Sequence, residues 1–166
     1  MTKAIYAGSF DPFTLGHLDI VNRAATIFDE VIIAISVNTS KKSLFTADEK
    51  VKMISTAIKK HSKKNIRVIQ FSDGLIVDLA EKEGAQVLLR GLRSSIDMEY
   101  EMNIASANKT QNHSIESMFL MADEKYRFIS SSLIKEIAQF QGDLSMMLSP
   151  GIAEEVKEKY QIKKGQ

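Results

Sequence analysis

The sequence predicts an α/β protein with a doubly wound, five-stranded parallel sheet of the Rossmann-like kind. Strand-like and helix-like segments alternate along the chain, and the strand-like segments are short apolar runs. Runs that are apolar at nearly every position are typical of parallel strands with helices on both faces. The 166 residues suit one domain. We therefore expect residues 1–166 to form a single domain, with a C-terminal helical segment from about residue 143.

Five segments have the composition of buried strands. The clearest is Val31–Val37, because its sequence VIIAISV is rich in β-branched residues and almost free of polar ones. The expected strands cover residues 4–7, 31–37, 66–71, 87–89 and 118–121.

The segments between the strands carry helix-start and helix-stop signals. Thr46 and Glu49 form a capping-box sequence that opens a helix. Thr14 is expected to cap the helix after the first strand. Asp73 is expected to cap a helix that ends at Gly84. Further helices are expected from about 97 to 109, with Met98, Met102 and Ala105 buried, from Ser130 to Gly142, and from Pro150 to about Tyr160.

Composition and charge exclude several classes of protein. The absence of cysteine excludes disulfides, thiolate chemistry and cysteine-ligated metal sites. A net charge of +1, from 22 basic and 21 acidic residues, argues against a general nucleic-acid binder. No apolar run approaches the roughly 20 residues of a membrane span, and the first residues lack the apolar stretch of a signal peptide. We expect a cytoplasmic protein without nucleic-acid or membrane partners.

The residues that follow the strands predict a polyphosphate site. In an open parallel sheet, ligands bind at the carboxyl ends of the strands. Cations, hydroxyl groups and glycines should therefore meet at one edge. The segments concerned are Gly8–His17, Asn38–Lys42, Ser72–Leu75, Arg90–Arg93 and Ser130–Ser132.

The first of these segments is the most informative. Gly8 lets the backbone approach a phosphate closely, and a cap at Thr14 places Gly16 and His17 in the first turn of a helix. Backbone N–H groups at a helix N-terminus attract anions, and a neutral imidazole can donate to the same anion. The alternative is a helix-capping histidine packed against Asp11 or Asp19.

These residues resemble a known family. Thr14-Leu15-Gly16-His17 is similar to the (T/H)xGH motif of the nucleotidyltransferase superfamily, and Gly8–Pro12 narrows the resemblance to the phosphopantetheine adenylyltransferase family. The resemblance runs from Ala4 to about Gly142. It departs mildly at two positions, with Tyr126 where some members have Trp and Met98 where many have Phe. Its further motifs are Ser40–Lys42, Arg90–Arg93, Asp97–Glu101 and Phe128–Ser132.

The resemblance implies a reaction between ATP and 4′-phosphopantetheine that gives dephospho-coenzyme A and pyrophosphate, with Mg²⁺ as cofactor. It also implies a homohexamer. The acceptor phosphate is already anionic at neutral pH, so no general base is required. Catalysis then consists of positioning and charge stabilisation.

Residue roles are carried over from the resembling motifs. His17 is expected to steady the α-phosphate, while Lys41 and Arg90 grip the acceptor phosphate. Leu75 is expected where the pantetheine pocket begins. Nucleotide contacts are expected from Ser9, Phe10, His17, Gly91, Arg93, Glu101, Tyr126, Ser130, Ser131 and Ser132, and Ser9 also contacts the acceptor.

Each role has a structural alternative. Lys41 could be a solvated lysine, Arg90 could form an ion pair with Glu99, and Glu101 could be an exposed helix acid. The Ser130–Ser132 turn could be a helix cap, although a cap needs only one hydroxyl. For the whole chain, the alternatives are a relative that uses CTP or accepts onto nicotinamide mononucleotide, and a non-catalytic sensor of nucleotides or coenzyme A.

Overall fold

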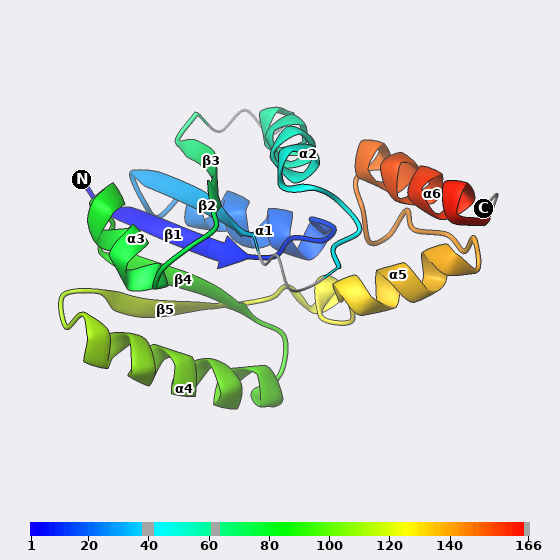
Figure 1. Ribbon diagram of the computed structural model, residues 1–166. Helices are drawn as coiled ribbons and strands as arrows, with labels where there is room; N and C mark the ends of the chain where they lie inside the picture. The colour runs from blue at the N-terminus through cyan, green and yellow to red at the C-terminus, as the bar shows by residue number, and fades with distance from the viewer. Residues whose placement is uncertain (38–41, 61–63, 165–166) are drawn as a thin grey trace.

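The computed structural model describes residues 1–37, 42–60 and 64–164, and it contains one five-stranded parallel sheet with helices on both faces (Figure 1). The strand order is β3-β2-β1-β4-β5, and every neighbouring pair is parallel. This order confirms the expected doubly wound sheet. The strands are β1 (Lys3–Gly8), β2 (Glu30–Ser36), β3 (Ile66–Phe71), β4 (Val87–Leu92) and β5 (Glu116–Met121).

Alternation along the central strands explains why both faces of the sheet are covered. In β2, Ile33 and Ile35 belong to one buried cluster, and Ile32 and Ala34 belong to another on the opposite face. The first cluster packs against α1 (Leu15–Ala24) and α2 (Ala47–Lys59). The second packs against α3 (Ile76–Glu83), and α4 (Ser95–Gln111) lies beside α3 over β4 and β5 (Figure 1).

The C-terminal part adds helices beyond the carboxyl edge of the sheet. A short 3-10 turn, η1 (Glu124–Tyr126), leads to α5 (Ser131–Gln139), and α6 (Pro150–Lys164) follows. Figure 1 shows α5 and α6 past the ends of the strands. Their buried residues belong to the cluster that also covers α1 and α2. None of the helices in the described part of the chain is both long and apolar enough to cross a bilayer.

Two expectations about the helices are wrong. Asp73 does not cap α3, which begins at Ile76 after Leu75 without a side-chain cap. Gly74 adopts φ 92°, and the turn there separates Asp73 from the helix. Met98 and Met102 are not buried but 45% and 51% exposed, since α4 buries only Glu101. Ala105 is half-buried.

Candidate active site

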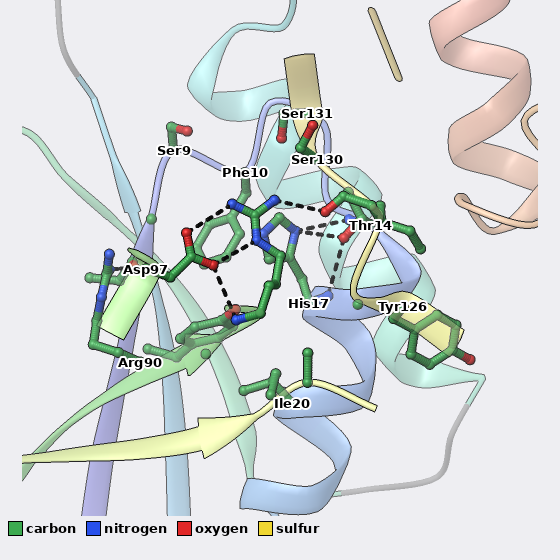
Figure 2. Close-up of a pocket in the computed structure, with 18 of the residues that line it drawn as sticks. Ser9, Phe10, Thr14, His17, Ile20, Arg90, Asp97, Tyr126, Ser130 and Ser131 are labelled. Atoms are coloured by element: carbon green, nitrogen blue, oxygen red, sulfur yellow. Dashed lines mark hydrogen bonds and ion pairs between the residues drawn. The ribbon is translucent and has the colours of Figure 1, made fainter. Parts of the chain in front are cut away.

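A pocket of about 370 Å³ lies at the carboxyl edge of the sheet, between the ends of β1 and β4. Here the strand order reverses, which is where open α/β sheets bind ligands. Figure 2 shows the side chains from β1, α1, β4 and the start of α5 that surround it. All ten expected nucleotide contacts and Arg90 line this pocket: Ser9, Phe10, His17, Arg90, Gly91, Arg93, Glu101, Tyr126, Ser130, Ser131 and Ser132.

The start of α1 fixes the orientation and the tautomer of His17. Thr14 Oγ1 accepts from the His17 backbone N–H at 3.2 Å, and the Thr14 backbone N–H donates to His17 Nδ1 at 3.0 Å (Figure 2). An Nδ1 that accepts a hydrogen bond carries no proton, so the neutral ring keeps its proton on Nε2. The expected cap at Thr14 is confirmed, and it leaves the Nε2–H of His17 as a donor.

Aromatic rings keep this imidazole neutral. Phe13 stacks on His17 at 5.5 Å, and Phe10 meets it edge-on at 5.1 Å. Burial, and to a lesser degree the charges of Arg93 and Arg90, lower the pKa of His17 from 6.5 to about 4. Phe10 itself has φ 44°, a left-handed conformation that costs a non-glycine residue on the order of 1 kcal/mol.

Neither aspartate proposed as the structural partner of His17 contacts it. Asp11 accepts from the backbone N–H groups of Leu44 and Phe45 and from Lys135 Nζ, all within 3.0 Å. Asp19 pairs with Arg23 at 3.1 Å. Asp11 thus ties the segment at Leu44 and Phe45 to the β1–α1 loop. The cap that His17 does make uses Nδ1, so capping does not compete with a ligand role for Nε2.

Arg90 is held by a carboxylate from α4. Its Nε and Nη2 donate to the two oxygens of Glu101 at 2.7 and 2.6 Å, and its Nη1 donates to the Ala7 carbonyl at 2.7 Å. Glu101 is only 8% exposed, so it is not the exposed helix acid considered above. The ion-pair partner of Arg90 is Glu101 rather than Glu99. Among the described residues, one N–H on each terminal nitrogen of this guanidinium has no bond partner.

Arg93 is oriented in the same way. Its Nε donates to Asp97 Oδ2 at 3.1 Å, and its Nη1 donates to the Ile129 carbonyl at 2.9 Å. The backbone N–H of Arg93 also donates to Asp97 Oδ2, at 3.1 Å. Sequence reasoning placed Asp97 only within a motif, although an acid four residues after an arginine at a helix start is a signal for an ion pair.

The start of α5 completes the pocket with hydroxyl groups. Ser130 Oγ accepts from the Leu133 backbone N–H at 3.1 Å and so caps the helix. Ser131 and Ser132 also line the pocket, and their hydroxyls bond to nothing in the described part of the chain. The turn therefore contains one capping hydroxyl and two that remain for a ligand, next to the N–H groups of a helix start.

The other two expected acceptor contacts are Lys41 and Leu75. Lys41 lies outside the described residues. Leu75 precedes α3, is 50% exposed, and is not among the residues that line the cavity.

The fold and the site together define a class of protein. The sequence model of the cytidylyltransferase-like family matches residues 5–137. Nicotinic acid mononucleotide adenylyltransferase from Plasmodium falciparum, solved in complex with NaAD, is similar in fold, with a TM-score of 0.71 at 15% identity over 95% of each chain. The chain is a nucleotidyltransferase.

Two curated relatives narrow the class. Phosphopantetheine adenylyltransferase from Heliobacterium modesticaldum is 49% identical over 96% of this chain and 94% of its own length. The protein of the same name from Finegoldia magna is 45% identical over 98% of both chains. The chain belongs to the phosphopantetheine adenylyltransferase family.

Proposed function

We propose that the protein transfers the adenylyl group of ATP to 4′-phosphopantetheine, which gives dephospho-coenzyme A and pyrophosphate. The single observation that carries the proposal is the pocket itself. Two arginines, a neutral histidine and the starts of two helices face one cavity in a chain 49% identical to a phosphopantetheine adenylyltransferase. An oxygen of the acceptor phosphate attacks the α-phosphorus, the bond from that phosphorus to the β-bridging oxygen breaks, and pyrophosphate leaves with the electron pair.

The residues of the pocket supply positioning and charge. The Nε2–H group of His17 donates a hydrogen bond to an α-phosphate oxygen, and His17 does not act as a general base. Arg90 serves the acceptor phosphate, and Lys41 is proposed to join it there. Arg93 and the free hydroxyls of Ser131 and Ser132 serve the β- and γ-phosphates. Because Glu101 and Asp97 hold the arginines in place before a ligand arrives, little ordering remains to be done on binding.

Magnesium belongs to the proposal as a cation that arrives on the ATP phosphates and neutralises part of their charge. The pocket carboxylates of Asp97 and Glu101 are each bonded to an arginine. Across the described ranges, no group of three or more His, Cys, Asp and Glu side chains is placed to hold a metal ion. We propose that the ATP phosphates and water molecules supply most of the magnesium ligands.

Pyrophosphate release tests the proposed function. The purified protein, supplied with Mg²⁺, should release pyrophosphate only when ATP and 4′-phosphopantetheine are both present. Equal or faster turnover with CTP, or with nicotinamide mononucleotide as acceptor, would contradict the substrate assignment. Binding of ATP without any turnover would favour the sensor alternative.

A cytoplasmic location remains part of the proposal, since ATP is a cytoplasmic substrate.

Exposed apolar side chains support the proposed homohexamer. Met98 and Met102 lie one turn apart on α4, and Met118 and Met121 on β5 are 45% and 49% exposed. The helix α4 lies beside β5, and neighbouring exposed apolar side chains commonly mark an interface. Light scattering should give about 110 kDa, six chains of 18.6 kDa. A stable monomer at micromolar concentration would contradict the assembly, and Met98→Glu with Met102→Glu should dissociate it.

A further inference from the structure

Tyr6 is a buried polar residue of the pocket to which the reaction outlined above gives no part. It lies in β1, is 6% exposed, and lines the cavity. Its ring packs edge-on against Phe10 at 5.3 Å and lies 6.2 Å from the ring of His17. These contacts place the phenol in the same aromatic group that encloses the imidazole.

The hydroxyl end of Tyr6 reaches from β1 to β4. Tyr6 pairs with Leu89 in the sheet, and Gly91 follows two residues later on the same face. A Cβ on Gly91 would lie 3.5 Å from Tyr6 Oη and 3.2 Å from Ile20 Cγ1. The missing side chain of Gly91 therefore makes the room that the phenol hydroxyl occupies, at the end of β4 that lines the pocket.

This hydroxyl has no hydrogen-bond partner among the residues that the structure describes. The hydroxyl oxygen is not among the fully buried polar atoms, so it keeps access to the cavity, where its partner comes from solvent or from a ligand. Because Tyr6 lines the cavity, the partner it can reach is a molecule bound there.

The charges around the phenol indicate what kind of group that is. Burial raises the pKa of Tyr6, and although Arg90 and Arg93 both act to lower it, the net shift is upward. The phenol therefore stays protonated at any working pH and can donate. The two guanidinium groups close enough to act on it also attract anions. Arg90 and Arg93 line the same cavity as the phenol, so an anionic oxygen bound there is an acceptor that can serve all three groups.

We infer that the Tyr6 hydroxyl donates a hydrogen bond to a phosphoryl oxygen of the bound reactants, at a position between Arg90 and Arg93 and next to His17. This inference rests on the proposed function and adds a ligand-contacting residue to it. In this account the ring of Tyr6 packs against Phe10 and stabilises the fold, while its hydroxyl contacts the ligand.

Tyr6→Phe tests the inference, because it removes the hydroxyl and keeps the ring. We expect kcat/KM for pyrophosphate release to fall about 10- to 100-fold, the range for losing a hydrogen bond to a charged group. The Tm without substrate should stay equal or rise, since no hydrogen bond within the described protein is lost. Tyr160→Phe on α6, outside the pocket, is the matched control and should keep wild-type activity.

A second measurement separates the failure of this inference from the failure of the proposed function. The rise in Tm produced by ATP and by 4′-phosphopantetheine is recorded for wild type and for Tyr6→Phe, so the contact is tested even if no pyrophosphate forms. At least one of the two ligands should stabilise Tyr6→Phe less than wild type. Unchanged ligand stabilisation together with kcat/KM within threefold of wild type would overturn the role of Tyr6. A wild-type protein that releases no pyrophosphate would overturn the proposed function instead.

Discussion

The two sides of the pocket act on phosphate in different ways. The β1–α1 side presents a neutral imidazole, enclosed by Phe10 and Phe13 and oriented by Thr14. The β4–α4 side presents charge, with guanidinium groups that are half-exposed and each anchored by a carboxylate four to eleven residues further along the chain. On the first side, burial keeps the imidazole of His17 unprotonated. On the second side, ion pairs orient the guanidinium groups of Arg90 and Arg93.

The difference assigns different tasks to the two sides. A neutral donor in a dry site costs no charge desolvation, and it gains strength as charge develops on the phosphate it contacts. A half-exposed cation contributes less per contact but attracts anions from solution. We therefore expect substitutions in the β1–α1 side chiefly to lower kcat, and substitutions in the β4–α4 side chiefly to raise KM.

Removal of the imidazole should have the largest effect. His17→Ala should lower kcat at least about 100-fold, the usual cost of one preorganised donor, with a much smaller change in ATP Kd. The capping bond to Thr14 is lost as well, so the free energy of unfolding should fall by about 1 kcal/mol. Assays of pyrophosphate release measure the change in kcat, and thermal unfolding measures the change in stability.

His17→Gln separates catalysis from capping. Glutamine at this position of a capping box can accept from the Thr14 backbone N–H, and its amide can donate but cannot act as a base. The Gln variant should keep the wild-type Tm and show a kcat between those of Ala and wild type. A His17→Ala protein that melts many degrees lower and keeps near-normal kcat per folded molecule would make His17 structural.

Arg90→Lys tests the charged side and should have the next largest effect. An ammonium cannot bond both oxygens of Glu101 and also reach the acceptor. The variant should therefore lose about 2–4 kcal/mol of transition-state stabilisation, measured as a fall in kcat/KM for 4′-phosphopantetheine. Arg67→Lys is the matched control, because Arg67 is likewise held by carboxylates, those of Glu30 and Glu83, outside the pocket. A value of kcat/KM within threefold of wild type would make Arg90 a structural residue.

Asp97→Asn should have a smaller effect, confined to the nucleotide. With one charged anchor lost, Arg93 samples more positions, and we expect the KM for ATP to rise about tenfold while kcat changes little. The exposed Asp78→Asn on α3 is the control. An equal loss with respect to the acceptor would show that the two arginines do not divide the reactants as proposed.

The smallest expected effect is a change in the free energy of unfolding at acid pH, which tests whether His17 is neutral. The folded-state pKa of His17, about 4, lies below the unfolded value near 6.5. Unfolding therefore takes up a proton between these values, and the associated stability is present above pH 6.5 and lost as pH falls toward 4. Between pH 7 and 5, wild type should lose about 1–2 kcal/mol more than His17→Gln. Equal losses would contradict the neutral assignment.

Local signals predicted the fold and most of the pocket. Apolar runs and parallel-sheet geometry were enough to bring Ser9, Arg90 and the Ser130–Ser132 turn to one edge. Failures arose where tertiary context decides. The spacing of Met98 and Met102 indicated a buried helix face, but periodicity cannot say whether that face meets the core of its own chain or another surface.

The partners of the arginines show the same limit. Glu99 and Glu101 are equally available in sequence, and only the approach of α4 to β4 selects Glu101 for Arg90. Tyr6 falls within the apolar strand expected over residues 4–7, and nothing in a single sequence indicates that its hydroxyl lies beside Gly91. Side-chain pairing across elements therefore needs the structure, whereas the position of the pocket does not.

Nitrogen-15 NMR of the His17 imidazole tests the central claim most directly, because it reads both the charge and the tautomer of the proposed donor. We predict a ring that stays neutral from pH 8 to pH 5, titrates near pH 4, and carries its proton on Nε2. A pKa at or above 6.5, or a proton on Nδ1 in the neutral ring, would contradict the account of His17 as a preorganised neutral donor.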